Sequence, residues 1–444
     1  MKSNVIKYIF FIAVIIIVGV AVYMIYEDNK SNSENTENQT TAQTNQTITD
    51  LRMEIVSYDT INPLISNNRN VQEITKLVFE PLLQLDENYK LQPCLATEWA
   101  KSGDTSYILK LRSNVKWQDG TSFTAQDVKY TIETLKQINS IYSYNVQHIA
   151  SVDIIDNYSI RINLDTIIPF FEYNLIFPIV SSTYFAGQDI QNTDKNATPI
   201  GTGMYKIESN STSTVVLKKN TSWWNISEKN AKVDTINVNK YSSMGEAYNA
   251  FKLGNIDILT TENIIGTIGY NKKEFYGREH DFIALNTYDN FLSRWEVRKA
   301  ISYAIDKSSI VTSVYGGKYY TADNPLDYGN WTFEQGSSSI GYNPDQAKQV
   351  LIDGGWSYKY GSWQKVENYK TIRLSINLTV NADNSSQVAV ADIIKTSLEN
   401  IGIKVNVSKL NSASFQTALN NKNYGMIITG TNSSLSPSLV TYFG

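Results

Sequence analysis

The chain has 444 residues, a formal net charge of −4 and 18% charged side chains. It is long enough for two or three lobes with sizeable cores, and it lacks the basic stripe that nucleic-acid binding requires. Its single cysteine excludes an intramolecular disulfide, and its two histidines, His148 and His280, show no metal-ligand spacing. We therefore expect no metal ion, no cofactor and no nucleic-acid partner.

The N-terminus contains a run without charge, residues 8–26, preceded by Lys2 and Lys7 and followed by Glu27 and Asp28. As a helix this run would be about 28 Å long, close to the thickness of a bilayer's hydrocarbon core. The distribution of charge predicts an uncleaved single-pass anchor in the first 26 residues, with the rest of the chain outside the cytoplasm. A cleaved signal peptide is the alternative, but no small-residue cleavage site ends the run.

Residues 27–50 follow the predicted anchor and consist almost entirely of polar side chains, with Asn, Thr, Gln and Glu most frequent. Such a segment has little to bury, so we expect a disordered tether. As a random coil it would extend about 25–30 Å from the membrane.

Two acids, Asp119 and Asp127, raise the possibility of a catalytic pair, but each has a local structural explanation. Residues 107–111 alternate as a half-buried strand, and Asp119 with Gly120 favours a turn. Thr124 and Asp127 form a T-x-x-D capping box at a helix start. The helix should bury the face made of Val128, Ile132 and Leu135. We interpret both acids as structural.

Further elements follow in chain order from the same rules of capping and periodicity. The predictions are a first strand over 51–58, a helix over 243–254, a short strand over 256–259, a helix over 296–305, a second helix capped by Asp306, and a helix from Asn343 to Gly354.

The C-terminal third alternates between strand and helix patterns. We expect strands over 372–380, 403–407 and 424–429, with helices over 388–401 and 415–419. This alternation with short connections predicts an α/β fold with a parallel, right-handed wound sheet. Ligands of such sheets bind at the carboxyl ends of the strands.

Sequence signatures of catalysis are missing. There is no G-x-S-x-G elbow and no glycine-rich phosphate loop, and Gly201–Tyr205 lacks the third glycine of a dinucleotide loop. A hydrolase with two carboxylates distant in sequence stays an alternative. The 29 tyrosines and 8 tryptophans, many beside Asn and Ser, suit a binding groove. The composition favours binding over chemistry.

A series of motifs runs in order along most of residues 51–430. Its members are Val78–Leu83, Leu91–Trp99, Leu109–Val128, Pro199–Tyr205, Phe282–Asn286, Val297–Asp306 and Tyr342–Lys348. Taken together, they resemble the solute-binding proteins of bacterial ABC transporters, specifically the oligopeptide/dipeptide-binding group known as family 5.

The resemblance implies a two-lobe periplasmic-binding-protein-like fold of type II. Lobe one would comprise residues 51–283 with an inserted subdomain at 82–198, and lobe two residues 284–444. Relatives continue for several tens of residues and return to the first lobe, so we expect that return to be missing. The implied function is capture of a peptide or related solute between hinged lobes by a monomer that docks on a membrane permease, without enzymatic chemistry.

Candidate ligand residues follow from the resemblance and from their positions after strands. Peptide binders of the group place an acid in the stretch that matches 430–438, and none occurs here. A sensor or adhesion ectodomain on the same fold is therefore the alternative function. The candidates are Tyr58 and Asn62 after the first strand, Asn286 at the hinge, Tyr315 and Trp331 around a loop of lobe two, and Asn432 and Ser434 in the acid-free stretch.

Overall fold

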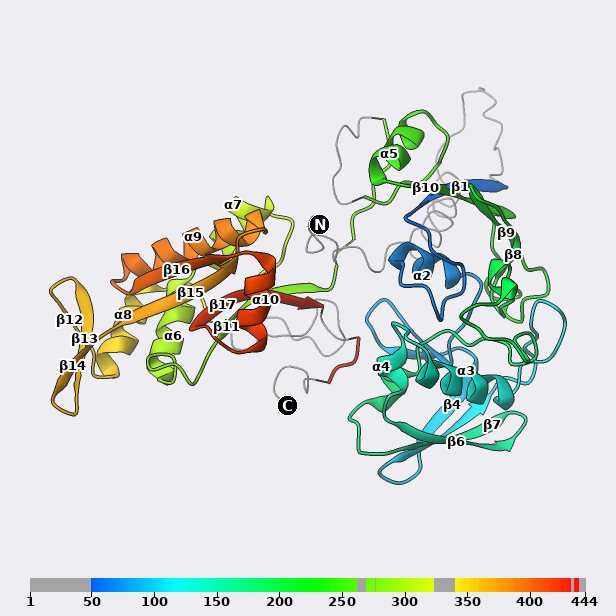
Figure 1. Ribbon diagram of the computed structural model, residues 1–444, viewed down its shortest axis with the longest axis horizontal. Coiled ribbons are helices and arrows are strands. Elements are labelled where there is room, and N and C mark those ends of the chain that lie inside the picture. The colour runs from blue at the N-terminus through cyan, green and yellow to red at the C-terminus, as the bar shows by residue number, and fades with distance from the viewer. Residues whose placement is uncertain (1–48, 262–268, 276, 323–339, 433–434, 439–444) are drawn as a thin grey trace, which may run out of the picture. The chain divides into compact units, whose positions relative to one another are not determined.

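The computed structural model describes two compact units (Figure 1), and each unit has its own core of buried side chains. The N-terminal unit runs to Gly277 and includes 435–438, whereas the C-terminal unit begins at Arg278. The described residues are 49–261, 269–275, 277–322, 340–432 and 435–438. Among them, no helix is long and apolar enough to cross a bilayer.

The predicted anchor, residues 8–26, and the predicted tether as far as residue 48 lie outside the described residues. The tether was expected to end at residue 50, but Asp50 already belongs to the first strand and pairs with Thr235. The polar side chain of Asp50 is compatible with this exposed end of the strand, so composition alone set the boundary too late.

The main sheet of the N-terminal unit has four strands in the order β1-β10-β9-β8. Strand β1 pairs with β10 in parallel, and the remaining pairs are antiparallel. Leu51, Met53 and Ile55 of β1 alternate onto a buried face. The bounds are β1 Asp50–Val56, β8 Tyr205–Asn210, β9 Thr214–Lys219 and β10 Thr235–Tyr241, with helices α2 Arg69–Thr75 and α5 Met244–Lys252 in contact with β1.

A second, antiparallel sheet lies in the part of the N-terminal unit between β1 and β8, in the order β4-β5-β7-β6. The short β2-β3 hairpin precedes it, and α3 contacts β6. The bounds are β2 Leu83–Leu85, β3 Leu91–Pro93, β4 Ala96–Lys101, β5 Ser106–Leu111, α3 Ala125–Gln137, α4 Ser143–Val146, β6 Ile149–Asp156 and β7 Ser159–Leu164.

The structural interpretation of the two acids is confirmed. Asp119 Oδ1 accepts hydrogen bonds from the Thr121 amide and hydroxyl, at 2.9 and 2.6 Å. Asp127 is 2% exposed, and its Oδ2 accepts from the Thr124 amide at 2.8 Å, which is the capping box. Its Oδ1 accepts from the Ser182 amide and hydroxyl, at 2.9 and 2.7 Å. Both carboxylates are therefore engaged in shaping the chain.

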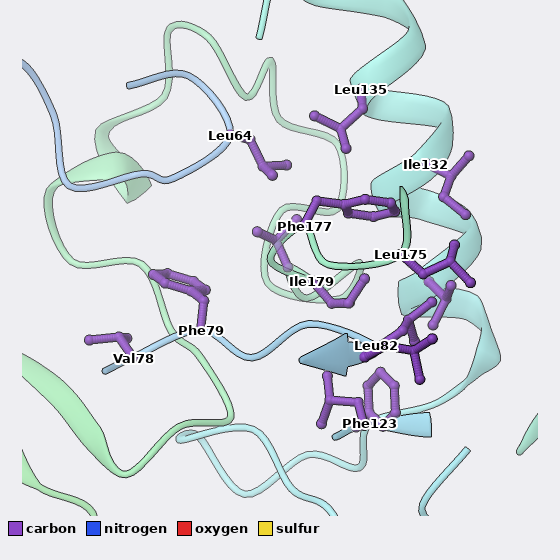
Figure 2. Close-up of a cluster of buried hydrophobic side chains, with 14 of the residues drawn as sticks. Leu64, Val78, Phe79, Leu82, Phe123, Ile132, Leu135, Leu175, Phe177 and Ile179 are labelled. Carbon is purple, nitrogen blue, oxygen red and sulfur yellow. The ribbon is translucent and has the colours of Figure 1, made fainter. Parts of the chain in front are cut away.

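One continuous core links the segments before and after residue 82 (Figure 2). Leu64, Val78 and Phe79 belong to the same buried cluster as Ile132 and Leu135 of α3. Figure 2 also shows Phe177 and Ile179 of a later loop among these side chains. The predicted subdomain, 82–198, thus shares its core with the rest of the N-terminal unit.

The buried carboxylate of Glu80 ties distant segments of the same unit together. It accepts hydrogen bonds from Trp223 Nε1 at 3.0 Å, Trp224 Nε1 at 2.8 Å and the Thr202 hydroxyl at 2.8 Å. The Arg112 guanidinium lies 4.1 Å from the centre of the Trp224 ring. Burial raises the pKa of Glu80, while these hydrogen bonds act in the opposite direction.

The C-terminal unit contains a four-stranded sheet in the order β11-β17-β15-β16. Strand β15 is parallel to both β16 and β17, as predicted, and β11 is an antiparallel edge. Figure 1 shows α9 and α6 alongside this sheet. The bounds are β11 Glu279–Leu285, α6 Trp295–Ala304, α7 Lys307–Tyr315, α8 Pro344–Asp353, β15 Ser375–Asn381, α9 Ser385–Asn400, β16 Lys404–Leu410, α10 Ser412–Asn420 and β17 Met426–Asn432.

Two predicted strands are wrong in detail. The single strand expected over 372–380 is divided at Leu374, because β14 (Lys370–Arg373) joins a separate sheet with β12 (Ser357–Lys359) and β13 (Ser362–Glu367). Alternation continues through the break, so the pattern could not locate it. The strand expected over 256–259 is only an isolated bridge between Met53 and Ile258.

Candidate functional site

The carboxyl ends of the parallel strands β1 and β10 carry a polar and aromatic cluster. The Lys240 ammonium lies 3.7 Å from the centre of the Tyr58 ring and donates to Asn210 Oδ1 at 2.7 Å. Asn210 Nδ2 donates to the Tyr58 hydroxyl at 2.9 Å. Partial burial raises the pKa of Tyr58 and lowers that of Lys240. The cluster holds the half-buried Tyr58 ring in a fixed orientation at the edge of the sheet.

Asn62 follows in the next loop, but its side chain serves the fold. It is fully buried, its Oδ1 accepts from the Leu64 amide at 3.0 Å, and its Nδ2 donates to Asn196 Oδ1 at 2.7 Å. Asp59 has a similar role, since its carboxylate accepts from the Asn67 amide at 2.9 Å. These hydrogen bonds fix the loop after β1. Of the two ligand residues predicted there, Asn62 is buried and Tyr58 is partly exposed.

Glu54 is a buried acid in β1 of the same unit. It is 5% exposed, and its Oε1 accepts from the Thr260 amide at 2.8 Å. Within the described part of the chain, Glu54 Oε2 and the Thr260 hydroxyl are both buried without a hydrogen-bond partner. Burial raises the pKa of Glu54 to about 7. The carboxyl therefore titrates near neutral pH.

A second cluster forms in the C-terminal unit around Tyr315, at the end of α7. Its hydroxyl donates to Asp281 Oδ2 at 3.1 Å, and its ring centre lies 4.2 Å from that of Tyr319. Asp281 in β11 pairs with Gly430 in β17, where a Cβ would come 2.4 Å from Asp281 Oδ1. Partial burial raises the pKa of both Asp281 and Tyr315. An acid and two tyrosines thus meet at one end of the sheet.

Asn286 lies directly after β11 and holds the turn that precedes β17. Its Nδ2 donates to the carbonyls of Lys422 and Tyr424, at 3.2 and 3.0 Å, and its Oδ1 accepts from the Tyr288 amide at 3.0 Å. The backbone amide of Asn286 also donates to the Gly425 carbonyl at 2.9 Å. These bonds give Asn286 a structural role within the C-terminal unit.

The remaining candidates are placed less fully. Asn432 is the last residue of β17 and pairs with Glu279. Trp331 and Ser434 lie outside the described residues. Sequence analysis missed Lys240, Asn210 and Asp281, because their roles depend on strand pairings between segments far apart in the chain. The only local signal was a polar residue at or near the end of a predicted strand.

The described residues contain little that could support bond-making chemistry. No group of three or more His, Cys, Asp and Glu side chains within them is placed to hold a metal ion. His148 pairs with Asp165 at 3.1 Å, with no serine or cysteine nucleophile among its hydrogen-bond partners in the described ranges. Cys94 is buried, and burial raises the pKa of its thiol well above the usual value.

The architecture described above is similar to that of known proteins. The chain is 24% identical over 380 residues to the glutathione-binding protein GsiB of Escherichia coli K12, which covers 80% of the chain and 68% of that relative. NikA from Brucella suis, solved with Fe(III)-EDTA, has a TM-score of 0.61 at 26% identity and covers 87% of this chain and 80% of its own.

A murein tripeptide-binding protein, MppA, in its unliganded open form, gives a TM-score of 0.73 at 20% identity, covering 87% of this chain and 78% of its own. The model of the bacterial extracellular solute-binding proteins, family 5, matches residues 90–443. That match extends over most of both units, so the chain belongs to the family 5 bacterial extracellular solute-binding proteins.

Proposed function

We propose that the chain captures peptides or related small solutes outside the cytoplasm and delivers them to an ABC importer. The observation that carries the proposal is the family match over residues 90–443, whose members bind solutes for ABC transporters and are not enzymes. Relatives that bind glutathione and a murein tripeptide support a peptide-like solute, and NikA supports the alternative of a chelated metal.

Capture would use the two residue clusters at the sheet ends, one in each unit. Tyr58, held by Lys240 and Asn210, offers an aromatic face and a hydroxyl. Asp281 with Tyr315 offers a carboxylate and a second aromatic face. In this proposal the two units, divided between Gly277 and Arg278, are hinged lobes, and the first contains the subdomain 82–198. A solute favours closure only by its higher affinity for the closed state.

We also propose that residues 8–26 anchor the protein in the membrane, with residues 27–48 as the tether. The uncharged run and the lysines that precede it support this proposal. Extraction of bacterial membranes at alkaline pH should leave the full chain in the membrane pellet, whereas deletion of residues 1–26 should release it. Release of the full chain by the same treatment would contradict the anchor.

Thermal unfolding of the full chain in detergent, with and without solutes, tests solute capture. A ligand at a hundred times its dissociation constant should stabilise the chain by about 2.7 kcal/mol. Mixed short peptides, glutathione and a nickel–histidine complex would be compared separately. We expect a shift with the peptides.

A matched pair of variants tests the part played by Tyr58. Tyr58→Ala should reduce the peptide-induced shift, whereas Tyr144→Ala, at an exposed tyrosine of α4, should leave it unchanged. A cooperative transition indifferent to all three solutes would contradict solute capture and favour a sensor. A shift with nickel–histidine alone would instead assign a metal chelate as the solute.

A further inference from the structure

The three-stranded sheet β12–β14, residues 357–373, has a two-residue turn at each end (Figure 1). Each turn contains a tyrosine that is exposed to solvent. Tyr360 lies in the turn between β12 and β13, and Tyr369 in the turn between β13 and β14. Their exposed fractions are 95% and 104%, and Val366 on β13 is 70% exposed. We call residues 357–373 the tyrosine-tipped sheet.

Both tyrosines occupy backbone positions that favour smaller residues. In the two turns, Tyr360 has φ 52° and Gly361 φ 75°, while Asn368 has φ 51° and Tyr369 φ 62°. Two-residue hairpin turns of this left-handed kind prefer Asn and Gly, because a side chain there crowds the carbonyl oxygen. Neither ring contacts another ring or forms a hydrogen bond among the described residues. The fold therefore gains nothing evident from these rings.

The charge of the tyrosine-tipped sheet is opposite to that of the whole chain. Its one acid, Glu367, is paired with Arg294 at 2.6 Å and with Lys365 at 3.4 Å. Three further basic side chains of the sheet are exposed and have no ion-pair partner among the described residues, namely Lys359, Lys370 and Arg373. The whole chain carries −4. A local excess of unpaired cations thus remains on this sheet.

One face of the sheet is attached to the body of the unit, and the opposite, free face is mostly exposed, although Gln364 on it is buried. Tyr358 and Trp363 are cross-strand partners on the attached face, where Trp363 Nε1 donates to the Ile401 carbonyl at 2.7 Å. Side chains alternate along each strand, so Lys359, Val366 and Arg373 lie on the opposite face. That face combines two of the unpaired cations with an exposed aliphatic side chain, between the two tyrosine tips.

We propose that the tyrosine-tipped sheet docks on the anionic headgroup surface of a lipid bilayer. Tyrosine rings suit the membrane interface because they are apolar with one polar end. Lys and Arg side chains near an anionic leaflet add attraction that depends on salt. A protein partner would be expected to bury a contiguous apolar patch, whereas the apolar groups here are separated at the two tips and Val366. This inference does not depend on which solute the chain binds.

A fluorescent reporter on the sheet tests the proposal in the full chain. The only natural cysteine, Cys94, is buried, so an environment-sensitive dye can be attached selectively at Thr371→Cys on the free face. A dye at Thr212→Cys, in the exposed β8–β9 turn of the N-terminal unit, is the matched control. Any anchoring by the N-terminus would bring both dyes to the membrane together.

Vesicles of phosphatidylcholine would be compared with vesicles that also contain phosphatidylglycerol. We expect a blue shift at position 371 only with phosphatidylglycerol, reversed by salt, and no shift at position 212. The double variant Lys359→Gln, Arg373→Gln, which removes both cations of the free face, should bind about thirtyfold more weakly. Equal responses at both positions, or a response to a soluble polyanion as strong as that to the vesicles, would overturn the proposal.

A second variant separates docking from stability. Tyr360→Asn with Tyr369→Gly relieves the backbone strain at both left-handed positions, so the melting temperature should rise. The blue shift at position 371 should be lost, because both tyrosine rings are gone. Tyr360→Trp with Tyr369→Trp should retain the shift, because tryptophan also suits the interface. A relaxed variant that still docks on phosphatidylglycerol vesicles as well as the natural chain would refute a role for the tyrosines.

Discussion

Replacement of Glu54 by Gln should change how the stability of the N-terminal unit depends on pH. The ordinary pKa of the carboxyl is 4.5, and burial raises it to about 7 in the folded chain. Between these values the folded state binds more protons than the unfolded state, so unfolding releases a proton. The stabilising contribution of Glu54 is full below pH 4.5 and is lost as pH rises through 7.

The size of the effect follows from the shift. About 2.5 pKa units at 1.36 kcal/mol each correspond to roughly 3 kcal/mol of free energy between pH 4.5 and 8. Glu54→Gln keeps an acceptor for the Thr260 amide and is neutral at every pH. The variant should therefore be about as stable as the natural chain near pH 4.5. At pH 8 it should be more stable by roughly 3 kcal/mol.

Native-state hydrogen exchange of the β1 and β10 amides would report this difference for the N-terminal unit alone. The variant and the natural chain would be compared at pH 5 and pH 8, after correction for intrinsic exchange rates. Glu208→Gln, on an exposed position of β8, is the control and should change little at either pH. If Glu54→Gln lowered the protection equally at both pH values, the buried carboxyl would be ionised throughout, and the reasoning would fail.

Substitutions at three other sites have expected outcomes. Glu80→Ala should destabilise the N-terminal unit by about 3–5 kcal/mol in urea denaturation, because the buried donors Trp223 Nε1 and the Thr202 hydroxyl and the partly buried Trp224 Nε1 lose their acceptor. Glu80→Gln should cost less, because it keeps an acceptor oxygen. Gly430→Ala should displace the Asp281 carboxylate and cost about 1–2 kcal/mol, seen as a lower melting temperature. Tyr369→Gly alone should raise stability by about 1 kcal/mol; a loss of stability would contradict the left-handed strain.

The sequence rules predicted local structure correctly where a few neighbouring residues determine it. Helix α3 buries its predicted face, and the predicted caps Asp306 and Asn343 accept from Ser309 and Gln346 amides. The family was also accessible from sequence, because its motifs are local and ordered. The break at Leu374 could not be predicted from the sequence, because apolar and polar residues alternate in the same way whether a strand stays in one sheet or passes into another.

The candidate residues show the same limit. Asn62 was chosen because it follows the first strand and Asn286 because it lies at the expected hinge, yet the side-chain amides of both bind the chain itself. Lys240 approaches Tyr58 only because β1 and β10 lie side by side. Asp281 meets Tyr315 only after β11 and α7 have packed. A single sequence does not state such pairings, so the polar clusters could not be predicted.

Asp127 makes a long-range contact that its local role in the capping box does not predict. The capping box accounts for one of its oxygens, while the other binds the amide and hydroxyl of Ser182, far along the chain. Glutamate, the usual residue at this place in a capping box, could close the box but would carry its second oxygen away from Ser182. The start of α3 and the loop around Ser182 should therefore unfold together, because unfolding of either one breaks hydrogen bonds to Asp127 that hold the other in place.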